Sequence, residues 1–453
     1  MSVNIKLRKG LDLNLAGKAE AKVSELSNSE TFAIKPPDFL GFEKPKVLVK
    51  VGDIVKAGDP LYYDKSLEAV KYTSPVSGEV VEVRRGAKRK LYEVIVRADK
   101  DIQYKQFKQY STSEIASLSE EQVKEALLEG GVWPHFIQRP FGIIPNPEQA
   151  PKAIFISGFD TSPLAPDYDF IYKGDEDAFK AGIEALKKLT KGKVHLNLSA
   201  NGSKFFANAK GVQVNTVSGP HPAGNVGVQI HHIDPINKGD VAYTIKPYGV
   251  IQIGKLLLKG QYDATKIVAL AGSEVSAPQY YKTLNGASIQ SLVEGKVKSD
   301  NVRYISGNVL SGAKVESDTH LGFYDELLTV IPEGNYAKFF GSFDPTKERH
   351  SISRSVGLLS FLNPKNKQYS PDTNINGEHR AFVQTGVFEK VVPMDILPTH
   401  LVKSILYEDY DEMEALGLYE VIEEDLALCE YVDVSKNEIQ SIIREGIDLM
   451  INS

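Results

Sequence analysis

The fold of this chain is decided by residues 212–227, which read VQVNTVSGPHPAGNVG. Residues 212–217 are strand-like, residues 226–233 can form a helix, and a loop with three glycines, two prolines and a histidine joins them. In α/β proteins, backbone N–H groups and the positive end of a helix dipole converge at such loops and bind anions or cofactors. A loop of this composition can also serve only to turn the chain, so both interpretations stay open. The candidate binding residues are Gly219, His221, Gly224 and Gly227.

Strand and helix patterns continue on both sides of this loop. A buried-type strand at residues 153–157, a helix capped by Asp175 and a strand at residues 194–198 make a β–α–β unit, which implies a parallel sheet. Further elements are expected as a helix at 203–209, a strand at 241–246 and a helix at 248–259. We therefore expect a Rossmann-like α/β domain over residues 104–260. Residues 158–163 form a second loop at the carboxyl edge of the sheet, where binding sites form.

An N-terminal β domain is predicted from residues 47–96, which contain many short strands. The pattern G-D-x-V-x-x-G-x-x-L followed by S-P-V-x-G-x-V resembles the biotinyl/lipoyl hammerhead. In that fold a lysine at a hairpin tip carries a swinging arm, and Asp64-Lys65-Ser66 is the nearest match. The arm before Lys65 is too short for a carrier, so we favour a packing module. We assign residues 1–103 to the N-terminal segment with this hammerhead.

The pattern of predicted secondary structure changes after residue 260. Short β runs separated by glycines stand at residues 266–270, 287–289, 302–305 and 309–310. They predict a β-grasp-like domain of the SLBB type over residues 261–344. Residues 345–375 are polar and rich in serine, asparagine and proline, as in a linker, and residues 376–453 predict a helical C-terminal domain. The fold class is thus a multi-domain α/β protein.

Composition excludes several classes of protein. No run of apolar residues approaches the length of a membrane-spanning helix, and the N-terminus has no signal-peptide pattern. The single cysteine, Cys429, suits a reducing compartment, so we expect a cytoplasmic protein. The net charge of −6 argues against nucleic-acid binding. A basic cluster at residues 84–90 and an acidic, base-free run at 404–430 are either solvated surfaces or docking faces.

Chemistry-bearing motifs are scarce. The chain has no G-x-G-x-x-G, P-loop or G-x-S-x-G motif, and the histidines at 221, 231 and 232 lack metal-ligand spacing, so we expect no metal and no catalytic residue. Residues 130–141 hold the only tryptophan beside two phenylalanines. Such a segment can clasp a flat ring or form an ordinary core edge. The candidate ring-contact residues are Trp133, His135, Phe136, Arg139 and Phe141.

A family resemblance rests on several segments that stand in one order. They are the hammerhead and residues 5–12, 127–133, 139–141, 218–224, 268–272, 394–399 and 424–429. Together they resemble the A subunits of the Na⁺-translocating NADH:quinone reductases. The resemblance implies a bacterial respiratory pump that oxidises NADH, reduces ubiquinone to ubiquinol and exports Na⁺. It places the A component peripherally on the cytoplasmic face of the inner membrane. Its implied partners are the B to F subunits, especially the membrane-embedded B component, with ubiquinone as a further candidate contact.

The same family is related to the C component of the electron-transport complex and to the NADH-oxidising subunit of complex I. Those relatives carry a glycine-rich flavin loop, which corresponds here to residues 129–134. Val132 and Trp133 put side chains where backbone must approach a flavin phosphate, and Cys429 is the only remaining cysteine. The resemblance therefore implies a cofactor-free subunit that serves the quinone-reduction end, while other subunits carry NADH, flavins, iron–sulfur and ubiquinone. The alternatives are a stand-alone flavin-dependent NADH dehydrogenase and a pure scaffold.

Overall fold

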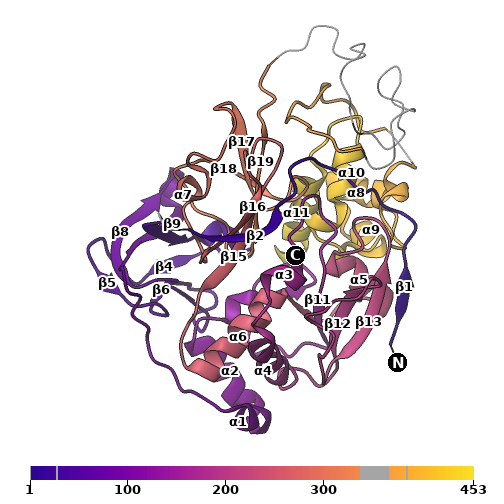
Figure 1. Cartoon of the computed structure of the whole chain (residues 1–453). Coiled ribbons are helices and arrows are strands. Elements are labelled where there is room, and N and C mark those ends of the chain that lie inside the picture. The colour runs from indigo at the N-terminus through magenta and orange to yellow at the C-terminus, as the bar shows by residue number, and fades with distance from the viewer. Residues whose placement is uncertain (1, 27–28, 337–349, 351–366, 384–385, 453) are drawn as a thin grey trace.

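The computed structural model describes residues 2–26, 29–336, 350, 367–383 and 386–452. These residues form four sheets and a cluster of C-terminal helices (Figure 1). The chain is thus a multi-domain α/β protein, as the sequence predicts.

The central α/β domain is built on a six-stranded sheet. Its order is β1 (Asn4–Lys6), β13 (Gln213–Ser218), β12 (Val194–Ser199), β11 (Ile154–Ser157), β14 (Ala242–Ile245) and β10 (Phe136–Arg139). The first five strands run parallel, and β10 pairs antiparallel with β14. The predicted parallel sheet is therefore confirmed, and the carboxyl ends of β11, β12, β13 and β14 share one edge.

The helices that the sequence predicts after Asp175, at 226–233 and at 248–259 are present, and three further helices accompany them. Together they are α1 (Thr112–Ser117), α2 (Glu120–Glu129), α3 (Tyr168–Ile171), α4 (Glu176–Leu186), α5 (Val226–Ile233) and α6 (Pro247–Lys259). Asp175 stands at the N-cap position of α4 as expected, but its carboxylate forms an ion pair of 3.0 Å with Lys255 of α6 instead of capping the helix. This ion pair fastens α4 to the helix beside it.

The helix expected at residues 203–209 is wrong. The segment forms turns, because the Asp169 carboxylate accepts hydrogen bonds from the Ser203 hydroxyl and from the backbone N–H groups of Lys204 and Phe205. Phe205 also packs edge-on against Phe179 of α4. Tertiary contacts thus override the local helix pattern.

The N-terminal β domain consists of two antiparallel sheets. One contains β3 (Thr31–Ile34), β9 (Leu91–Ala98), β8 (Gly78–Arg85) and β5 (Ile54–Val55), and the other contains β4 (Pro45–Val47), β6 (Pro60–Asp64) and β7 (Lys71–Thr73). The many short strands expected here are present. Lys65 is exposed in the turn after β6, and the Asp64 carboxylate holds that turn by accepting from the backbone N–H of Ser66 at 2.8 Å.

Within the N-terminal segment predicted as residues 1–103, the first strands pair with sheets outside this β domain. Strand β1 is the edge of the α/β sheet, and β2 (Glu20–Glu25) is the edge of the fourth sheet. In Figure 1 the indigo segment accordingly runs along both neighbours before it enters the β domain. The N-terminal segment therefore ties three parts of the molecule together.

The fourth sheet is built mainly from residues 265–332 and is completed by β2. Its order is β18 (Ala313–Val315), β17 (Val302–Ser306), β19 (Leu327–Pro332), β15 (Thr265–Ala271), β16 (Gln279–Leu284) and β2, accompanied by α7 (Ile289–Val293). The expected β run at 287–289 is reduced to isolated bridges at Ala287 and Ser288 before α7, and the run expected at 309–310 is wrong, because these residues lie in a turn. The expected linker at 345–375 lies mostly outside the described residues.

The C-terminal region is helical, as expected. It contains α8 (Pro398–Leu406), α9 (Tyr410–Ala415), α10 (Ala427–Val432) and α11 (Ile439–Asn452), around a core that includes the buried thiol of Cys429. Across the described parts of the chain, none of the helices combines the length and the apolarity needed to cross a bilayer.

Candidate functional site

Two loops meet at the carboxyl edge of the parallel sheet, and they are the two that the sequence marks. The Thr161 hydroxyl lies 3.1 Å from Nδ1 of His221 and accepts the backbone N–H of Gly224 at 2.9 Å. The Ser157 hydroxyl donates to the carbonyl of Gly224 at 2.9 Å. The loops after β11 and β13 therefore form one joined surface, as expected for the binding edge of an α/β sheet.

The glycines of the loop after β13 give room to other parts of this chain. A Cβ atom at Gly219 would lie 2.7 Å from the Leu7 side chain, and one at Gly224 would lie 2.6 Å from the Thr161 nitrogen. A Cβ at Gly227 would lie 2.4 Å from a carboxylate oxygen of Asp425. Three separate segments thus press against the loop where only glycine leaves space.

The Asp425 side chain lies beside Gly227 in the first turn of α5, where the sequence predicts an anion-binding site. It comes from a short 3₁₀ turn, η7 (Glu423–Leu426), and its carboxylate accepts a hydrogen bond of 2.9 Å from the guanidinium of Arg139 at the end of β10. The same guanidinium donates to Glu424 at 3.0 Å, and both Arg139 and Asp425 are almost fully buried. A carboxylate of the chain itself therefore stands beside the positive end of the helix dipole.

Burial and nearby charges shift the pKa values of two residues near the Arg139–Asp425 pair, Glu424 and Lys246. Burial and the adjacent Asp425 raise the pKa of Glu424 to about 7, although Arg139 opposes the shift. Burial lowers the pKa of Lys246, which follows β14, but nearby carboxylates led by Glu326 outweigh it and leave the pKa raised. The Glu424 partner of Arg139 is therefore harder to ionise than an isolated carboxyl group.

His221 is held as a neutral packing residue. Its backbone N–H donates to the Asp12 carboxylate at 2.8 Å, and its ring contacts Thr161. Burial lowers the pKa of His221, against the opposing effect of Asp160 and other carboxylates. A cleft of about 580 Å³ borders the loop after β11 and is lined by residues 12–15, Lys18, residues 158–169 and 202–203, and Gln368.

The aromatic candidates are mostly buried rather than gathered around a cavity. Trp133 and Phe136 are 1% and 0% exposed, and the Trp133 indole N–H donates to the Pro145 carbonyl at 2.9 Å. The His135 ring lies 4.7 Å from the Phe323 ring. Phe141 alone among the five candidates is partly exposed, with its ring 5.8 Å from that of Tyr419. The five candidates are neighbours in the chain, but they face different surroundings.

The segment that corresponds to a flavin loop is filled by side chains of this protein. Val132 and Trp133 are buried. Cβ atoms at Gly130 and Gly131 would lie 2.1 Å from Leu256 and 2.2 Å from Thr73. These glycines serve close packing against α6 and β7 in place of access for a phosphate.

The remaining histidines of α5 fasten the C-terminal helices to the α/β domain. His231 Nδ1 lies 2.6 Å from a Glu420 oxygen, and His232 Nε2 lies 2.8 Å from the Pro393 carbonyl. In the residues described above, no group of three or more metal-ligating side chains has the arrangement of a metal site. Asp425 and Glu424 are not among the residues that the sequence predicts for the site, although the base-free acidic run at 404–430 indicates carboxylates that need cations from elsewhere.

Known proteins match along nearly the whole chain. Residues 5–99 match the NqrA N-terminal barrel-sandwich hybrid domain, residues 118–262 the NqrA second alpha/beta domain, and residues 267–317 the NQRA C-terminal domain.

Individual relatives are similar over the same extent, and each is named as the A component of a Na(+)-translocating NADH-quinone reductase. The protein of Photorhabdus laumondii is 38% identical over 442 residues, covering 97% of this chain and 98% of the relative. That of Yersinia pseudotuberculosis is 39% identical over 443 residues with the same coverage. That of Neisseria meningitidis serogroup B is 36% identical over 445 residues, covering 98% of each.

We predict that the buried Arg139–Asp425 ion pair contributes strongly to the free energy of unfolding. Because Asp425→Ala leaves a buried guanidinium with only Glu424 as partner, we expect it to destabilise the chain by about 3 kcal/mol. The double variant Arg139→Met/Asp425→Leu removes both charges and should lose less. Denaturant unfolding of the full chain measures both. Lys180→Ala, which breaks an exposed pair with Asp177, is the control and should cost less than about 1 kcal/mol. Equal losses in Asp425→Ala and the control would contradict the prediction.

We predict that the buried His135 makes the folded protein less stable in acid. Burial, with a smaller effect of Lys266, lowers its pKa from 6.5 to about 3. The unfolded state therefore binds an extra proton between these values, so the free energy of unfolding falls as the pH falls through this window. We expect His135→Phe to reduce this acid sensitivity in urea unfolding followed from neutral pH downward. His400→Gln, at an exposed position, should leave the profile unchanged. An identical pH profile for His135→Phe and the parent would refute this.

Proposed function

The chain belongs to the family of A subunits of the Na(+)-translocating NADH-quinone reductases, and we propose that it serves as that subunit in a respiratory Na⁺ pump. The pump couples NADH oxidation and the reduction of ubiquinone to ubiquinol to the export of Na⁺. The observation that carries this proposal is the match to relatives of that name at 36–39% identity, over 97–98% of this chain and 98% of theirs. The chain is a noncatalytic subunit of an enzyme that is both an oxidoreductase and a translocase.

We propose further that this subunit binds no cofactor of its own. Three contacts support it: Asp425 beside the first turn of α5, Leu7 against Gly219, and the buried Trp133 in the segment corresponding to a flavin loop. Each puts a side chain where a cofactor phosphate would need free backbone. NADH, flavins, iron–sulfur and ubiquinone chemistry then belong to other subunits.

Membrane partners follow from the same assignment. We propose that this chain assembles with the B to F subunits on the cytoplasmic face of the bacterial inner membrane, with the membrane-embedded B component as its principal partner. The exposed part of the acidic run, including Glu408, Asp411 and Glu412, offers a docking face for such a partner. A stand-alone flavin-dependent NADH dehydrogenase is not favoured, because the full-length relatives are named as one subunit of a reductase.

Removal of the chain from cells tests the assignment. Membranes from cells that lack it should lose Na⁺-dependent quinone reduction by NADH, and re-expression of the chain should restore it. The purified chain should show no flavin absorbance and should not oxidise NADH. A purified chain with a stoichiometric flavin band and NADH oxidase activity would establish the stand-alone dehydrogenase instead.

Contact with quinone is a second proposal, and Phe141 is its accessible residue. Trp133→Ala or Phe136→Ala would empty the core and cost about 3–5 kcal/mol, so these variants confuse folding with binding. Phe141→Ala in the assembled complex avoids this. We expect it to weaken binding of a quinone-site inhibitor by about 1–3 kcal/mol if the ring is a wall of the site. Tyr336→Ala, at another exposed aromatic position, is the control. Unchanged inhibitor affinity in a complex that assembles would remove this chain from the quinone site.

A further inference from the structure

The basic cluster at residues 84–90 forms the tip of the β8–β9 hairpin, and its backbone is well defined. A short 3₁₀ turn, η2 (Ala87–Arg89), closes it, with positive φ at Lys88 (52°) and Arg89 (62°). The Gly86 N–H donates to the Lys90 carbonyl at 2.9 Å, and the Arg89 N–H donates to the Gly86 carbonyl at 3.1 Å. These bonds hold the backbone of the basic cluster in one turn conformation.

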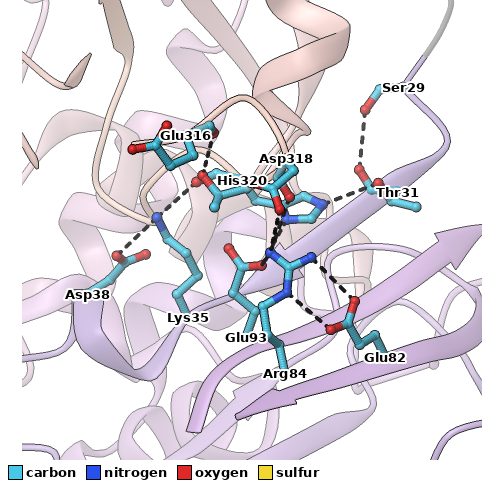
Figure 2. A network of polar contacts seen from close by, with 11 residues as sticks. Ser29, Thr31, Lys35, Asp38, Glu82, Arg84, Glu93, Glu316, Asp318 and His320 are labelled. Atoms are coloured by element: carbon cyan, nitrogen blue, oxygen red, sulfur yellow. Dashed lines mark hydrogen bonds and ion pairs between the residues drawn. The ribbon is translucent and has the colours of Figure 1, made fainter. Parts of the chain in front are cut away.

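One of the five basic residues in the cluster has a structural role at the base of the hairpin. The Arg84 guanidinium donates to Glu82 at 3.1 Å and lies 3.3 Å from the buried Glu93 carboxylate, which is 3.4 Å from His320 (Figure 2). Arg84 also donates to the Asp318 carbonyl at 3.2 Å.

This network joins the hairpin to the loop before β19. The His320 ring contacts the Thr31 hydroxyl at 3.2 Å, and the Lys35 ammonium donates to the His320 carbonyl at 2.9 Å (Figure 2). Burial raises the pKa of Glu93, but His320 and Arg84 outweigh it and lower the pKa overall. The base of the hairpin is therefore anchored by buried charges.

The other four basic residues point outward. Arg85, Lys88, Arg89 and Lys90 are exposed, and none has a carboxylate within 4.0 Å in the part of the chain that the structure describes. Tyr92, 42% exposed, lies beside them, with its ring over Gly86. An anchored hairpin thus presents four exposed cations and one aromatic ring at a convex tip.

We propose that this tip, residues 85–92, binds an anionic phospholipid surface. Each cation near such a surface increases binding about fivefold, and a tyrosine suits the membrane–water interface. The tip is convex and borders none of the clefts of about 690, 720 and 580 Å³, so it lacks the pocket that anchors a protein partner. A flat, adaptable anionic surface fits it better.

The negative charge of the rest of the chain favours an orientation in which the tip faces the anionic surface. The whole chain carries −6, so the remainder is more acidic still and is repelled by an anionic surface. The tip therefore orients the molecule, while four cations alone give only weak, salt-sensitive attachment. The inference rests on the proposed function, because membrane partners bring the chain near lipid.

Vesicle binding by the full chain tests the proposal. Vesicles of phosphatidylcholine with phosphatidylglycerol, at about two to one, should bind the chain at low salt, whereas phosphatidylcholine alone should not. Lys88→Gln/Arg89→Gln should weaken binding about 20- to 30-fold. The control Lys50→Gln/Lys56→Gln removes the same charge from exposed positions of the same domain and should have a much smaller effect. Equal weakening by both variants, or binding without regard to anionic lipid, would overturn the proposal.

Assembly separates this inference from the proposed function. If Lys88→Gln/Arg89→Gln binds vesicles like the parent but no longer assembles with the other subunits in detergent, the tip binds an acidic protein segment and the lipid proposal is wrong. If the parent binds no vesicles yet restores quinone reduction in cells, the lipid proposal fails and the proposed function stands. If the parent binds vesicles but restores no activity, the proposed function fails.

Discussion

The rest of this structure depends on the buried ion pair between Arg139 and Asp425. The arginine ends β10 at one edge of the α/β sheet, and the aspartate arrives from the C-terminal helices some 286 residues later. Burying two charges is costly unless each satisfies the other, so the pair forces the C-terminal domain into one position. The fit is close enough that only glycine is tolerated at position 227.

The N-terminal segment provides the second constraint. It supplies β1 to the α/β sheet and β2 to the fourth sheet before the β domain begins. Because one short segment supplies an edge strand to each of two sheets, moving these sheets far apart would break at least one of the two ladders. This interlocking suits a protein whose task is to hold a fixed shape within a complex, rather than to open and close around a substrate.

The two constraints meet at the loop that most resembles a binding site. Leu7 packs on Gly219 from one side, Thr161 contacts Gly224 from another, and Asp425 fills the space beside Gly227. A phosphate or carboxylate ligand would be stabilised here by the helix dipole and by Arg139, and the Asp425 carboxylate exploits the same interactions. Side chains of the protein itself therefore occupy this edge of the sheet and join distant segments there.

The sequence by itself determined the local elements. The strands at 154–157, 194–199 and 213–218 and the helix at 226–233 follow from periodicity and from glycine and proline placement, because neighbouring residues decide these patterns. It also marked the loops at 158–163 and 218–227 as one edge, since parallel strands end together. Only the tertiary structure decided what fills that edge. Asp425, Leu7 and the turns at residues 203–209 are set by contacts between segments far apart in the chain, and a single sequence carries no signal of which distant charge will pair with which.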